Sequence, residues 1–98
     1  MIRHIVAFEL DTVDDETRQA HIGRMRDVLE ALATLDEVAS IVVRPDLGIV
    51  DGHWDVVLVS EHRSKADLEA YQAHPEHRKA AAIAGEFVAR RAVVDYEY

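Results

Sequence analysis

A chain of 98 residues is long enough for one domain but short for two, so residues 1–98 are expected to form a single domain. Its 11 basic and 19 acidic residues give a net charge of 11 − 19 = −8, which argues against binding to nucleic acid or to an anionic membrane surface. The absence of cysteine excludes disulfides, thiol nucleophiles and cysteine-ligated zinc. No run without a charged residue exceeds six residues, which is too short to cross a bilayer, and we expect a cytoplasmic protein.

Hydrophobic periodicity divides the chain into strands and helices. Residues 2–10 alternate with a period of two, which is typical of a strand. After Asp14, a residue suited to begin a helix, apolar residues recur at helical spacing as far as Leu35. Pro75 disfavours helical backbone at His74 and so separates two later helices. The pattern predicts strands at 2–10, 38–44, 53–61 and 87–98, and helices at 15–35, 65–73 and 76–84.

The predicted order is β-α-β-β-α-β, with a short extra helix before the last strand. This βαββαβ order is that of the ferredoxin-like α+β fold, in which helices cover one face of an antiparallel four-stranded sheet. The second and third strands follow each other too directly for a parallel crossover, so we expect them to form an antiparallel pair.

All four predicted strands carry apolar side chains on both faces. In the first strand Ile5 and Ala7 alternate with apolar residues of the opposite face, and the other strands repeat this pattern. Two helices can cover only one side of such a sheet, and burial of the other side is worth roughly 25 cal/mol per Å² of apolar area. We therefore expect a homodimer in which two sheets pack face to face. The alternative is that β-branched residues simply favour strands, whichever face they occupy.

The densest polar cluster surrounds the break between the two later helices and contains Tyr71, His74 and His77. Tyr71 and His74 share a side of the first helix, and Pro75 places His77 in the first turn of the next. Histidine exchanges protons near neutral pH and tyrosine can donate through its hydroxyl, so the cluster could perform acid–base chemistry if it faces a cavity. The alternative is structural, with a hydroxyl that anchors a loop and imidazoles that close helix ends.

We expect no metal and no cofactor. His74 and His77 form a His-x-x-His pair, but zinc needs three or four protein ligands and the chain has no second compact pair. Gly48 and Gly52 lack the following helix and the lysine of a phosphate-binding loop. The chain contains neither a Ser-His-Asp signature nor a dinucleotide-binding motif.

Two further polar residues are expected inside the fold. His4 lies on the covered face of the first strand, so its ring needs a hydrogen-bond partner or a wet pocket. Asp55 lies in the predicted third strand, where a half-buried carboxylate must be paired. The remaining histidines are expected at the surface or in loops: His21, His53 and His62.

Five segments together have the pattern of a known family: the opening Ile-Arg-His-Ile-Val-Ala-Phe, Asp55, the run from Asp67 to Tyr71, His74-Pro75-Glu76-His77, and the closing Val94-Asp95-Tyr96-Glu97. They resemble the stress-responsive A/B barrel (Dabb) domain over nearly the whole chain. The Tyr-x-x-His-Pro-x-His block is the most specific part. The resemblance implies a dimeric α/β barrel with a pocket between the sheet and the helices.

The resemblance also implies roles for individual residues. One plant member is a polyketide cyclase that performs an aldol condensation without metal or organic cofactor. Its catalytic tyrosine and histidine match Tyr71 and His77, its first-strand histidine matches His4, and Asp55 lies roughly where it has another histidine. By this likeness His77 would remove a carbon-bound proton and Tyr71 would hold the enolate oxygen, while His4, Asp55 and His74 would bind substrate.

Two classes of function remain open from the sequence. The first is an enzyme or ligand-binding protein whose enclosed pocket takes a small organic molecule and performs cofactor-free cyclase-, lyase- or isomerase-like chemistry. An accessory role in a biosynthetic pathway would be a variant of it. The second is a non-catalytic dimerising module of the stress response, for which a filled interior is expected.

Overall fold

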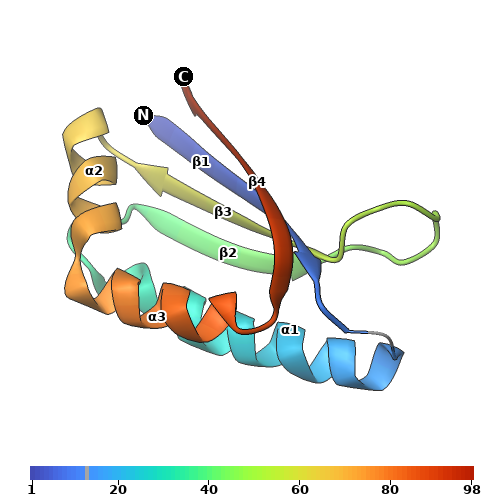
Figure 1. Cartoon of the computed structure of the whole chain (residues 1–98). Helices are drawn as coiled ribbons and strands as arrows, with labels where there is room; N and C mark the ends of the chain where they lie inside the picture. The colour runs from blue at the N-terminus through green and yellow to red at the C-terminus, as the bar shows by residue number, and fades with distance from the viewer. Residues whose placement is uncertain (13) are drawn as a thin grey trace.

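The computed structural model describes residues 1–12 and 14–98, which form a four-stranded antiparallel sheet with α-helices packed beside it (Figure 1). In chain order the elements are β1 (Ile2–Leu10), α1 (Asp15–Glu30), the 3₁₀ turn η1 (Ala31–Thr34), β2 (Ser40–Pro45), β3 (Val56–His62), α2 (Lys65–Ala73), α3 (Pro75–Gly85) and β4 (Val88–Glu97). This order and the antiparallel pairing confirm the predicted ferredoxin-like α+β fold. Within the described residues, none of the helices has both the length and the apolar character needed to cross a membrane.

The sheet has the strand order β2-β3-β1-β4, with β4 at one edge. β1 pairs with β3 from Ile2 opposite His62 to Phe8 opposite Val56, and with β4 along its other side. The β1–β4 register shifts near Leu10, and β4 curves strongly along its length (Figure 1). Because residues directly opposite each other project to the same face, this register decides which side chains meet on each side of the sheet.

Capping residues explain where the helices begin. Asp14 precedes α1 and accepts a hydrogen bond of 2.8 Å from the N–H of Thr17, while Ser64 does the same for α2. His74 caps α3, because its Nδ1 accepts the N–H of Glu76 at 3.0 Å. Pro75 occupies the first position of α3, where its missing N–H costs no hydrogen bond.

Several predicted boundaries differ from the structure by one or two residues, and the largest differences are at the end of the first helix and at the start of β3. The first helix ends at Glu30 instead of Leu35, but the apolar spacing continues because Leu32, in the turn η1, is buried in the core. β3 begins at Val56, since the preceding loop reaches the sheet only at Asp55, whose N–H donates to the carbonyl of Phe8 at 2.9 Å. β3 also extends one residue further than predicted, as far as His62.

The hydrophobic core lies between the helices and one face of the sheet. Its buried side chains include Met25 and Leu29 of α1, Leu68 of α2, and Val6 and Phe8 of β1. In Figure 1, α1 and α3 run beneath the sheet and α2 stands at its end, so all three helices lie toward the same side.

The opposite face of the sheet, here called the open face, carries no helix (Figure 1). By register its centre is apolar and consists of Ile5, Ala7, Val42, Val57, Val59, Ala92 and Val94. Ion pairs lie toward its two ends: the Arg3 Nε is 2.9 Å from a Glu61 carboxylate oxygen, and the Arg90 guanidinium is 2.8 Å from Glu9. Val94 is 60% exposed. The predicted second apolar face is therefore present and is uncovered in the single chain.

Candidate functional site

A cavity of about 660 Å³ lies between the inner face of the sheet and the helices α2 and α3. We call it the Tyr71 cavity. Its walls are mostly apolar and include Phe8 and Leu58 of the sheet and Leu29 of α1. The polar residues in its lining come from β1, α2, α3 and β4: His4, Tyr71, Gln72, His77, Arg90 and Arg91. An apolar hollow with a few convergent polar groups is the usual form of a small-molecule site.

Tyr71 lies at the centre of this arrangement and is 0% exposed. Its ring packs against the imidazoles of His62 and His77, with ring centroids 4.8 Å and 4.5 Å away. Among the described residues, none forms a hydrogen bond with its hydroxyl, and burial raises the pKa of Tyr71 to about 12. The hydroxyl therefore keeps its proton at neutral pH and retains an O–H that can donate a hydrogen bond.

His77 has one ring nitrogen fixed by the backbone. Its Nδ1 lies 3.2 Å from the carbonyl oxygen of Gln72, which can only accept, so Nδ1 carries the proton and Nε2 holds the lone pair. Burial lowers the pKa of His77, and the nearby charge of Arg91 acts in the same direction. The imidazole is therefore neutral at pH 7, which is the form required of a general base.

His4 is held by a carboxylate. The imidazole is buried, and its Nδ1 lies 2.5 Å from Oδ1 of Asp95, the residue directly opposite in β4. The expected partner of this covered histidine is thus Asp95. Because Nδ1 donates to the carboxylate, Nε2 is the ring nitrogen that remains for a ligand in the cavity. The centroids of the His4 and Tyr71 rings are 6.4 Å apart.

The prediction that His62 lies at the surface is wrong. Its pairing with Ile2 draws it into the sheet, where it is 0% exposed. Its Nδ1 donates to the carbonyl of Glu37 at 2.6 Å, and its Nε2 accepts the hydroxyl of Ser60 at 2.9 Å. Burial lowers the pKa of His62. Both nitrogens are occupied, so the ring supports Tyr71 from behind and is not among the cavity-lining side chains.

The two other histidines expected at the surface differ from each other. His21 is half-buried and stacks on Phe87 with ring centroids 4.2 Å apart. The side chain of His53 is 51% exposed in the β2–β3 loop, where it lies 3.2 Å from the carboxylate of Asp46. Only His53 therefore behaves as expected.

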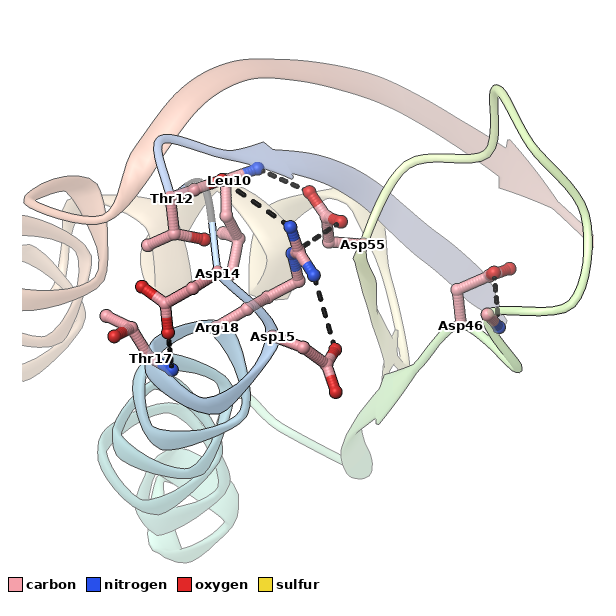
Figure 2. Close-up of polar contacts among 9 residues, drawn as sticks. Leu10, Thr12, Asp14, Asp15, Thr17, Arg18, Asp46 and Asp55 are labelled. Atoms are coloured by element: carbon pink, nitrogen blue, oxygen red, sulfur yellow. Dashed lines mark hydrogen bonds and ion pairs between the residues drawn. The ribbon is translucent and has the colours of Figure 1, made fainter.

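Asp55 and His74, both expected to bind substrate, lie outside the Tyr71 cavity. Figure 2 shows the Asp55 carboxylate between the end of β1 and the start of α1: one oxygen accepts the N–H of Leu10 at 2.7 Å, and the other is 3.3 Å from Nε of Arg18. Asp55 precedes β3 instead of lying within it, and its side chain joins the end of β1 to the start of α1. His74 serves as the cap of α3. In the structure, both residues therefore bind groups of the protein itself, whereas both were expected to bind substrate.

The expected site is thus reduced to three residues that line one cavity, His4, Tyr71 and His77. Across residues 1–12 and 14–98, no three histidine or carboxylate side chains come close enough together to hold a metal ion. The three residues provide a neutral imidazole with a free nitrogen, an unpaired hydroxyl and a carboxylate-backed imidazole. Such a set can accept a proton and stabilise a developing negative charge on oxygen.

Sequence reasoning missed three groups of this site: the Asp95 carboxylate, the Gln72 carbonyl and the Arg91 side chain. For Asp95 and Arg91 a signal existed, since both alternate with the apolar residues of the last strand and so share a face. No signal in the sequence marks a backbone carbonyl as the partner of an imidazole.

Comparison with known proteins places this fold and site in a family. The family model described as "Stress responsive A/B Barrel Domain" (Dabb) matches residues 2–98. A stress-response A/B barrel domain-containing protein of Arabidopsis thaliana is 31% identical over 80 residues, covering 79% of this chain and 37% of that protein. The chain spans about a third of the length of the curated relatives it matches.

Solved structures agree with the family model. A dimeric protein of unknown function with a ferredoxin-like fold from Bacteroides fragilis is similar with a TM-score of 0.87 and 32% identity, covering 99% of this chain and 95% of that one. A dimeric ferredoxin-like protein of unknown function from Thermobifida fusca is similar with a TM-score of 0.80 and 31% identity, covering 99% and 90% of the two chains. The chain belongs to the stress-responsive A/B barrel domain family.

Proposed function

We propose that the Tyr71 cavity binds a small organic molecule and moves a proton at one of its carbon atoms without a cofactor. The observation that carries this proposal is the pairing of a neutral imidazole with a free hydroxyl in one cavity, the two rings being 4.5 Å apart between centroids. A non-catalytic module would be expected to fill its interior. A cavity of about 660 Å³ beside such a pair supports the first function over the second.

The proposed chemistry follows from the state of each group. Nε2 of His77 takes a proton from a carbon next to a carbonyl group, and the electron pair moves onto the carbonyl oxygen to form an enolate. The Tyr71 hydroxyl donates a hydrogen bond to that oxygen and keeps its own proton, because its pKa of about 12 disfavours ionisation. The enolate then attacks a second carbonyl, expels a leaving group or regains a proton at another position, which gives cyclase-, lyase- or isomerase-like products.

Three physical features favour the direction of this proton transfer. The lowered pKa of His77 keeps its base form populated at neutral pH. The Gln72 carbonyl stabilises the ring when it becomes charged, because the Nδ1–H donates to it at 3.2 Å. Apolar walls such as Phe8 and Leu58 lower the local polarity on their side of the cavity, which strengthens the electrostatic contacts made there.

We also infer that two copies of the chain pair through their open faces. The bare apolar centre of that face supports this inference, because a patch of that kind is rarely left in water. The Bacteroides fragilis and Thermobifida fusca structures, which share 32% and 31% identity with this chain, are described as dimers. The Tyr71 cavity lies on the other side of the sheet, so pairing of this kind would leave one cavity in each copy.

Hydrogen–deuterium exchange at carbon tests the proposed chemistry without knowledge of the natural substrate. The protein in D₂O is mixed with a panel of small carbonyl compounds that carry an acidic C–H, and loss of that signal is followed by proton NMR. We expect acceleration for compounds that shift the amide signals of cavity residues. The H77Q variant should lose about 100-fold or more of this rate, and Y71F a similar factor.

The control variants change the same residue types at exposed positions. H53Q and Y98F should keep the wild-type exchange rate, because neither residue lines the Tyr71 cavity. Two results would overturn the proposal. One is an H77Q variant that exchanges as fast as the wild type, and the other is the absence of any acceleration for compounds that occupy the cavity.

A further inference from the structure

The Tyr71 cavity has a charge composition unlike that of the whole chain. The chain carries 19 acidic and 11 basic residues, yet among the described residues no aspartate or glutamate lines the cavity, and the Asp95 carboxylate on the same face of the sheet is paired with His4. Two arginines of β4, Arg90 and Arg91, are among its lining residues, but the Arg90 side chain leaves β4 on the open face beside Glu9, so the cationic side chain of the lining is that of Arg91. A guanidinium in the lining of a mostly apolar cavity attracts anions locally, even on a protein whose net charge is negative.

Of these two arginines, Arg91 is the one available to a ligand. Arg90 is paired, with its guanidinium 2.8 Å and 3.0 Å from the Glu9 carboxylate. Arg91 stands opposite Phe8 in the register of the sheet, so its side chain leaves β4 on the inner face, as Phe8 does from β1. Among the residues that the structure describes, no carboxylate lies within salt-bridge distance of Arg91.

The position of Arg91 relative to the proton acceptor is also defined. Arg91 and His77 both line the cavity, from β4 and α3 respectively, and the charge of Arg91 is felt at the imidazole. Phe8 and Leu58 supply apolar surface on the sheet side of the same cavity. The lining of one cavity therefore combines a guanidinium, an apolar wall and the base.

We propose that Arg91 makes the cavity selective for small organic acids, binding their carboxylate while the apolar part lies against the sheet and the reactive carbon faces His77. This inference rests on the proposed function of the same cavity and names its substrate class. The planar guanidinium presents two parallel N–H donors that match the two oxygens of a carboxylate, which an uncharged amide cannot reproduce. Arg91 is exposed, so its guanidinium is accessible to a ligand from solvent.

The test compares two probes of almost equal shape, benzoate and benzamide, by NMR titration of the labelled protein. The wild type should bind benzoate about tenfold more tightly than benzamide, and R91Q should bind both alike, with the preference lost. R24Q is the matched control, because Arg24 is an exposed arginine of α1 that does not line the cavity. It removes the same charge and should keep the wild-type preference.

Each outcome separates this inference from the proposed function. Equal binding of both probes to the wild type, or an unchanged preference in R91Q, overturns the role of Arg91 and leaves the cavity as a binding site. An equal loss in R24Q and R91Q attributes the preference to net charge and also overturns it. If neither probe shifts the amide signals of the cavity lining, small aromatic molecules do not enter the cavity. That result overturns the role of Arg91 as well.

Discussion

Replacing Val59 by glutamate tests whether a second copy of the chain covers the open face. Val59 lies in β3 near the centre of that face, directly opposite Ile5 of β1 on one side and Val42 of β2 on the other. In a single chain a glutamate at this position can reach solvent. In a face-to-face pair the same carboxylate is buried among apolar side chains.

The size of the effect follows from burial. Covering a valine side chain contributes about 1.5–3 kcal/mol, and burying a carboxylate without a partner costs several kcal/mol more. Twofold symmetry imposes the change twice in each dimer. We therefore expect V59E to raise the dissociation constant of the dimer by at least about 1000-fold, or about 4 kcal/mol, while the single chain keeps its fold.

Sedimentation equilibrium over a range of micromolar concentrations measures this effect. The matched control is A82E, which adds the same charge at an exposed position of α3 and should leave the dimer intact. Circular dichroism checks that both variants are folded. A V59E protein that sediments as a dimer with wild-type affinity would refute the reasoning, as would a wild-type protein that stays monomeric throughout.

Three further predictions concern stability. Y71F should unfold at the wild-type temperature or above, because the lost hydroxyl has no hydrogen bond within the described residues, whereas Y71A should lose about 3–5 kcal/mol by chemical denaturation. D55A should lose about 1–3 kcal/mol, because the N–H of Leu10 and the Arg18 side chain lose their partner, yet it should bind cavity probes normally. Burial lowers the pKa of His62 in the folded protein, so unfolding below pH 6.5 takes up a proton and the free energy of unfolding falls as the pH drops. In H62N the free energy of unfolding should fall less between pH 6.5 and 5, the difference being up to about 1.4 kcal/mol per pH unit.

Much of the fold could be predicted because the patterns that define it are local. The period of two in residues 2–10 matches β1, and Pro75 with its preceding histidine marks the break between α2 and α3. The two errors at β3 arise from long-range pairing. Whether a strand includes His62 depends on the presence of Ile2 opposite it, which spacing along the chain does not reveal. The apolar spacing places Leu32 in the first helix, because a 3₁₀ turn can bury the same apolar residue as a helix.

The site was less predictable than the fold, since it depends on tertiary contacts. Tyr71 and His77 are close in sequence and their meeting follows from the helix break. His4 reaches them only through the order of strands in the sheet. Asp55 looked like a site residue for a sound reason, the need of a half-buried carboxylate for a partner, but the partner is the N–H at the end of β1. Only the family resemblance places Asp55 in the cavity, and a resemblance in sequence does not determine which groups a side chain contacts.

The most direct test of the account is the protonation state of His77 in the ligand-free protein. Long-range ¹H–¹⁵N correlation spectra of the protein labelled at its six histidines distinguish the two neutral tautomers and, recorded as a function of pH, give the pKa of each ring. The account predicts that His77 is the Nδ1–H tautomer with a pKa below 6.5. A proton on Nε2 would show that the nitrogen facing the cavity offers no lone pair, and a pKa well above 7 would show that the ring is mostly charged at neutral pH; either result would contradict the proposed chemistry.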